Sequence, residues 1–96
     1  MNRLIIYQYI NRLGKEDIVR YCNSHGIFVD NNDLDVVYYY VKNEYKRFFN
    51  DQISVLNEIK DKVSDYTYGE IMKMYDKYKY MIKWEQFFVL IFVLFN

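Results

Sequence analysis

The C-terminal part of this chain contains nine consecutive apolar residues, at positions 87–95. Each large apolar side chain gains roughly 1.5–3 kcal/mol when it leaves water, so full burial of this segment is worth on the order of 10–20 kcal/mol. That free energy is comparable to the whole net stability of a small domain. The chain therefore has to fold or assemble in a way that covers these side chains.

The preceding residues show the spacing of helices. Apolar residues recur at intervals of three and four, and no sustained alternation typical of a strand occurs before Lys83. We therefore expect an all-α fold, a small four- to five-helix bundle with an apolar C-terminal extension. A chain of 96 residues has room for one hydrophobic core. We divide it into a helical domain at 1–83 and an apolar aromatic tail at 84–96.

Two glycines set the first helix boundaries. Gly14 separates a first helix at about 2–12 from a second helix at about 15–25. Gly26 follows the second helix, where glycine readily adopts the left-handed conformation of a C-terminal cap. We therefore expect two short helices joined by a break at Gly14.

Polar residues predict the later helix starts. The cluster 30–33 supplies N-terminal caps for a third helix, which reaches a turn around 48–50. A fourth helix covers about 51–64. Thr67 and Glu70 form a T-x-x-E capping box that starts a fifth helix. The apolar stripe of the fourth helix is Ile53, Leu56, Ile59 and Val63.

Two groups of residues have a spacing that occurs in metal or catalytic sites, but the sequence favours structural roles for both. Cys22 and His25 lie on one helix face, yet the chain has no further Cys or His to complete a zinc site. Residues three apart on a helix also rarely converge on one substrate, which argues against a nucleophile and base. Asp30, Asp33 and Asp35 lack the glycine and glutamate of a calcium loop, so we expect helix caps there. We predict no catalytic residue, metal, cofactor or small-molecule substrate, and therefore no enzyme.

The charge balance and the cysteine content indicate which class of partner and which cellular compartment to expect. Thirteen basic and thirteen acidic residues balance, which argues against nucleic acid as a partner. Cys22 is the sole cysteine, so no internal disulfide forms, and we expect a cytoplasmic location. Four basic residues precede the apolar tail: Lys73, Lys77, Lys79 and Lys83. They support an alternative, a peripheral protein at the inner membrane face with lysines toward headgroups.

The tail itself predicts an association surface. Its interaction residues are Trp84, Phe87, Phe88, Ile91, Phe92 and Phe95. We expect a non-enzymatic interaction or adaptor protein that uses this aromatic surface for binding a protein partner or for self-association. Three fates of the tail stay open: packing on the bundle or on a second copy, insertion into a membrane or partner, and an unselected extension.

The order of turns and apolar positions resembles a known family. The matching features are Ile10-Asn11, Tyr21-Cys22, Gly26-Ile27-x-Val29, Phe48-Phe49-Asn50, and the stripe of Leu56 and Ile59 before Thr67. Over about residues 10–78 the chain resembles the bacterial family called domain of unknown function 2624. It departs at Gly14, where a Ser or Thr cap is expected, and after Tyr80. The resemblance implies a short helical cytoplasmic protein of low-GC Gram-positive bacteria and transfers no catalytic residue.

Overall fold

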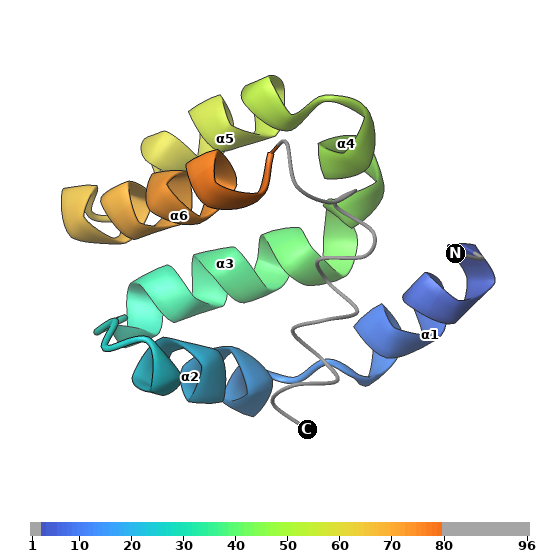
Figure 1. Ribbon diagram of the computed structural model, residues 1–96, viewed down its shortest axis with the longest axis horizontal. Helices are drawn as coiled ribbons and strands as arrows, with labels where there is room; N and C mark the ends of the chain where they lie inside the picture. Colours follow the sequence, from blue (N-terminus) through green and yellow to red (C-terminus); the bar gives the residue numbers. More distant parts are fainter. Residues whose placement is uncertain (1–2, 80–96) are drawn as a thin grey trace.

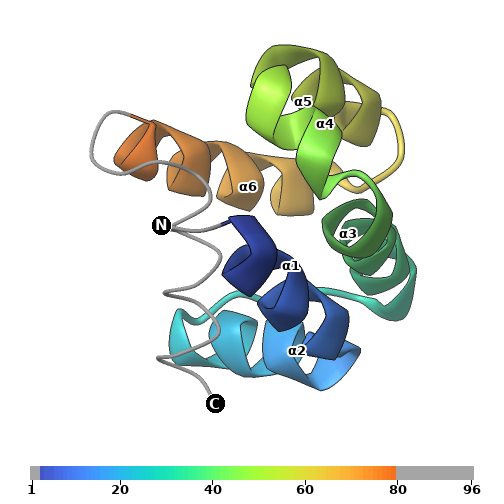
Figure 2. The ribbon, with the colours of Figure 1, turned by 90° about the vertical axis from the view of Figure 1, so that its right-hand side faces the viewer.

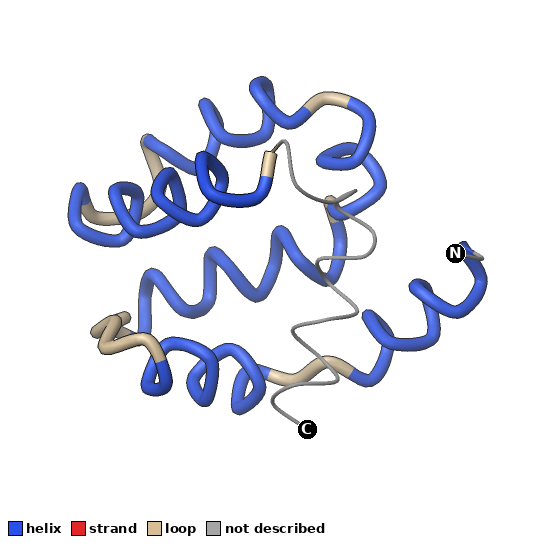
Figure 3. The backbone as a smooth tube through the Cα atoms, viewed as in Figure 1, coloured by secondary structure: helices blue, strands red, loops and turns tan. Residues whose placement is uncertain are grey.

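The computed structural model describes residues 3–79. These residues form six α-helices and contain no strand (Figure 3). The helices are α1 (Arg3–Arg12), α2 (Lys15–Ser24), α3 (Asn31–Asn43), α4 (Tyr45–Asn50), α5 (Gln52–Lys60) and α6 (Asp65–Tyr78). The predicted all-α class is confirmed. The boundary predicted between the helical domain and the tail, at 83 and 84, lies outside the described residues.

Helix α3 occupies the middle of the fold. It lies between α2 on one side and the pair α5 and α6 on the other (Figure 1). Helix α1 packs against α3 as well, and α4 turns the chain from α3 into α5 (Figure 2). Helices from both ends of the described chain therefore meet around α3.

The two glycine boundaries are confirmed. Helix α1 ends and α2 begins on either side of Gly14, whose N–H donates to the carboxylate of Asp17 at 2.8 Å. Gly26 has a φ of 67°, the left-handed conformation. The N–H of Ile27 donates to the carbonyl of Cys22 at 2.8 Å, and that of Gly26 to Asn23 at 3.3 Å. These two bonds are a Schellman cap, which satisfies carbonyls at the end of α2.

The long third helix predicted to reach 48–50 is divided at Glu44. This residue has φ −120° and ψ 11°, which ends α3 and starts the short α4. The bend turns α4 toward α1, where Tyr45 and Phe49 pack against buried Ile10. The ring of Tyr45 also meets the ring of Tyr7 edge to face, with centroids 5.5 Å apart. The described residues therefore form six helices where four to five were expected.

The capping box predicted for the last helix is wrong. Helix α6 starts at Asp65, and its N-cap is Ser64, whose hydroxyl accepts the N–H of Thr67 at 3.2 Å. Thr67 therefore lies inside the first turn, and its own hydroxyl donates to Asp33 at 2.6 Å. Glu70 pairs instead with Lys73, at 3.2 Å. The side chain of Thr67 therefore pairs with Asp33, which is distant in sequence, and not with Glu70 in the same helix.

The buried face of α5 also differs from the prediction. Ile53 is 57% exposed, whereas its neighbour Val55 is 1% exposed. Leu56 and Ile59 are buried as expected, and Val63 packs at the margin of the same cluster. The buried face is rotated toward Val55 because α5 contacts Tyr40 of α3 and Ile71 of α6.

Lys42 connects α3 to the C-terminal end of α1. Its ammonium group donates to three carbonyl oxygens, those of Ile10 at 2.7 Å, Asn11 at 2.9 Å and Leu13 at 2.9 Å. These carbonyls lie at the end of a helix, where its dipole is negative, and that of Ile10 also accepts the N–H of Leu13 at 3.1 Å. One lysine therefore caps α1 from a helix about thirty residues away.

Candidate functional site

The predicted association surface cannot be placed. All of its residues lie outside the described part of the chain: Trp84, Phe87, Phe88, Ile91, Phe92 and Phe95. Lys83 lies outside it as well. The structure therefore shows the helical body onto which this surface is attached, and the candidate site is a feature of that body.

The described lysines of the predicted basic stretch have acidic neighbours. Lys73 pairs with Glu70 at 3.2 Å, and Lys79 with Asp76 at 3.1 Å. Each pair joins residues one turn apart on or at the end of α6. Lys77 is exposed. Lys73 and Lys79 thus have a carboxylate partner close by, which reduces the positive field that an anionic surface would meet.

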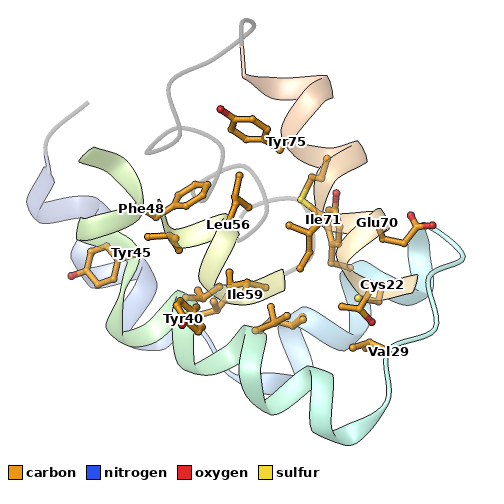
Figure 4. Close-up of a pocket in the computed structure, with 18 of the residues that line it drawn as sticks. Cys22, Val29, Tyr40, Tyr45, Phe48, Leu56, Ile59, Glu70, Ile71 and Tyr75 are labelled. Carbon is orange, nitrogen blue, oxygen red and sulfur yellow. The ribbon is translucent and has the colours of Figure 1, made fainter. Parts of the chain in front are cut away.

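An apolar cavity of 190 Å³, partly open to solvent, lies inside the helical body. Every described helix contributes side chains to its wall, and Figure 4 shows a part of them. Phe48 of α4 and Leu56 of α5 face Ile71 and Tyr75 of α6 across this space (Figure 4). The predicted sites did not include this cavity, because its wall is assembled from residues spread over more than sixty positions.

The cavity borders two separate parts of the core. In one, Ile10 is buried beneath Tyr9, Tyr45 and Phe49. In the other, the buried side chains are Tyr40, Val55 and Ile59. Tyr9, Ile10 and Tyr45 of the first cluster and all three buried residues of the second line the cavity. A small domain usually has one contiguous core, so the cavity marks the place where this core is incomplete among the described residues.

The size of the cavity, 190 Å³, limits what it can hold. An apolar cavity of roughly 150 Å³ already takes up a benzene molecule. The cavity is thus large enough for an aromatic side chain.

Three polar side chains in the cavity wall have hydrogen-bond partners, and the rest of the wall is almost entirely apolar. The hydroxyl of Tyr40 donates to Glu58 at 3.1 Å, and that of Thr67 donates to Asp33 at 2.6 Å. Glu70 accepts a hydrogen bond from Lys73. With these groups engaged, the wall offers apolar contact and shape to an occupant rather than hydrogen bonds.

Cys22 also lines the cavity, as a half-buried thiol. Burial raises the pKa of this thiol, which favours the neutral form over the nucleophilic thiolate. The Nδ1 atom of His25 lies 2.9 Å from the carbonyl oxygen of Tyr21, and its ring stacks on that tyrosine. Among the described residues, no group of three Cys, His, Asp or Glu side chains converges to hold a metal ion.

Asp33 forms a buried polar connection beside the cavity wall. Asp33 is 2% exposed, and its carboxylate accepts the N–H of Ser64 at 3.2 Å and the hydroxyl of Ser64 at 2.7 Å. Thr67 adds a third donor at 2.6 Å. Burial raises the pKa of Asp33, but hydrogen bonds from Ser64 and Thr67 outweigh it and hold the pKa below its ordinary value. The start of α3 is thereby fixed to the start of α6, two helices that both line the cavity.

The capping role predicted for the acidic run is confirmed for Asp30 alone. Asp30 caps α3 by accepting the N–H of Asp33 at 2.8 Å. Asp33 receives donors at the start of α6, as described above. Asp35 instead forms an exposed ion pair with Lys15 at 2.5 Å.

No protein-family model, curated protein or solved structure matches this chain. The resemblance to domain of unknown function 2624 stays a prediction. Within residues 3–79, no helix is both long and apolar enough to cross a bilayer.

Proposed function

We propose that this protein is a small cytoplasmic interaction or adaptor protein that works through apolar association rather than through a reaction. In this proposal a helical bundle carries an apolar C-terminal extension, and the aromatic residues of that extension bind a protein partner or a second copy. The observation that supports it most is the apolar cavity, whose wall offers almost entirely apolar contact area.

The sequence of the extension supports the same proposal. Large aromatic side chains are the residues that most often dominate binding free energy at interfaces, and Trp84 with four phenylalanines supplies five of them. A segment this apolar needs a covering surface, and association provides one. Charge contributes little to the proposed recognition, because acidic and basic residues are equal in number.

The experiment compares the native chain with a variant carrying Phe87→Ser, Phe92→Ser and Phe95→Ser. Size-exclusion chromatography with light scattering gives the molar mass, and affinity capture with mass spectrometry gives the partners. A buried aromatic anchor contributes about 2 kcal/mol or more to an interface. Loss of three anchors is therefore expected to weaken association by at least tenfold. Phe28→Ser is the matched control, since Phe28 is 86% exposed on the helical body.

The outcomes separate the proposal from its alternatives. Loss of a dimer or of a specific partner in the triple variant, with both retained in Phe28→Ser, supports the proposal. An identical molar mass and partner set for all three proteins contradicts it. Flotation with vesicles of anionic lipid tests the membrane alternative. Salt-sensitive flotation would favour that alternative, although two of its lysines already pair with carboxylates.

A further inference from the structure

The cavity needs an occupant that the described residues do not supply. Its wall comes from all six helices, and the two clusters of the core meet at its border. Several of its wall residues, including Phe48, Met74 and Tyr75, are only half-buried. An apolar group placed between them would bury these side chains further and join the two clusters into one core.

The chain itself contains an apolar segment that could supply this group. Residues 80–96 follow the described part, and nine of these seventeen are the consecutive apolar residues 87–95. Tyr75 lines the cavity, and α6 ends only one turn later at Tyr78. At up to about 3.6 Å per residue, the four residues 80–83 span at most roughly 14 Å. A connection of this length lets the tail 84–96 reach the cavity.

We infer that the tail 84–96 of each molecule occupies the apolar cavity of that same molecule. A tethered segment on a short connection has an effective concentration in the millimolar range, which favours its own cavity over that of a second copy at ordinary protein concentration. The cavity volume accommodates an aromatic ring of the tail, while the other apolar residues cover the half-buried wall.

This inference rests on the proposed function and adds regulation to it. The aromatic residues proposed to bind a partner are held in the cavity when the partner is absent. A partner then has to bring an apolar surface that competes with the cavity, or a surface that binds the tail more tightly than the cavity does. Ligands shift such an equilibrium only by their differential affinity for the two states.

Cys22 allows a direct test in the full chain. It lines the cavity and is the sole cysteine. Four variants each place one new cysteine in the tail: Phe88→Cys, Ile91→Cys, Phe92→Cys and Phe95→Cys. Each is oxidised at about micromolar concentration and analysed on a non-reducing gel and by mass spectrometry. A disulfide requires two Cα atoms within about 7 Å, so the bond reports proximity to the cavity wall.

At least one tail position is expected to form an intramolecular disulfide with Cys22 at a rate that does not depend on protein concentration. This rate should exceed by at least tenfold that of the matched control Ile53→Cys, which replaces an exposed apolar residue of α5 outside the cavity wall. A second readout uses the chain without new cysteines. Cys22 should react with a thiol reagent about tenfold more slowly in the native chain than in the triple serine variant.

Two results would overturn the inference. Disulfide-linked dimers in place of linked monomers would place the tail in the cavity of a second copy. Absence of any tail disulfide, with equal Cys22 reactivity in the native and triple serine chains, would leave the tail outside the cavity. These results are independent of the association experiment. A monomer linked in cis supports cis docking even if the triple serine variant keeps every partner, and tail-dependent dimers support the proposed function even if cis docking fails.

Discussion

Asp33 is the side chain whose replacement tests the helical body most sharply. Its buried carboxylate receives three donors from the start of α6, the N–H and hydroxyl of Ser64 and the hydroxyl of Thr67. Asp33→Asn keeps the size of the side chain but removes its charge and leaves one acceptor oxygen. Hydrogen bonds to charged groups are worth roughly 1.5–3 kcal/mol each, and an unpaired buried donor carries a desolvation cost of about 1–3 kcal/mol.

We therefore expect Asp33→Asn to lose about 2–3 kcal/mol of unfolding free energy, measured by urea denaturation followed by far-UV circular dichroism. In a domain of this length each kcal/mol shifts Tm by roughly 4–8 °C, so Tm should fall by on the order of 10–20 °C. Asp35→Asn is the matched control. It lies on the same helix and removes the same charge, but its pair with Lys15 is exposed and worth about 0–1 kcal/mol.

The same comparison has a defined pH dependence. The pKa of Asp33 is lowered in the folded state, so its charged form stabilises the fold fully above the unfolded pKa of about 3.9. This stabilisation is lost as pH falls through the folded pKa. The difference between native chain and Asp33→Asn should be constant from about pH 5 to pH 8 and narrow below about pH 4. Equal stability of the two asparagine variants at neutral pH would refute this reasoning.

Three further predictions concern other parts of the body, each measured by thermal or urea unfolding. Lys42→Met should lose about 1–3 kcal/mol, because three carbonyls at the end of α1 lose their hydrogen bonds to the ammonium group; an unchanged Tm would contradict that cap. Leu56→Ala should lose about 2–5 kcal/mol, whereas exposed Ile53→Ala should change stability by at most about 0.5 kcal/mol. Equal losses would contradict the assigned face of α5. Gly26→Ala should lose about 1–2 kcal/mol because its φ is 67°, whereas Gly69→Ala within α6 meets no atom within 4 Å and should gain about 0.5–1 kcal/mol. The same sign for both glycine variants would contradict the cap.

The features predicted correctly from the sequence depend on neighbours within a few positions. Gly26 ends α2 because a left-handed residue completes hydrogen bonds with the preceding turn. Asp30 caps α3 because its acceptor lies three residues from the donor. The all-α class follows from the apolar spacing, which is a property of each helix by itself.

The features that were missed depend on partners far along the chain. Glu44 has no proline or glycine beside it to signal a break, and the bend exists because α4 packs on α1. Thr67 pairs with Asp33, thirty-four residues away, so the local box with Glu70 does not form. The cavity is likewise a property of six helices packed together. Ser64 preceding Thr67 is the one local signal that would have placed the start of α6 correctly.

The fluorescence of Trp84 tests most directly whether the apolar tail is covered, since it is the sole tryptophan and belongs to the proposed association surface. If the tail is covered, emission of the native chain is shifted to shorter wavelength than emission in urea, and acrylamide quenches it several-fold less. The same emission wavelength and quenching in buffer and in urea, from a folded monomer, would show that the tail is exposed to water.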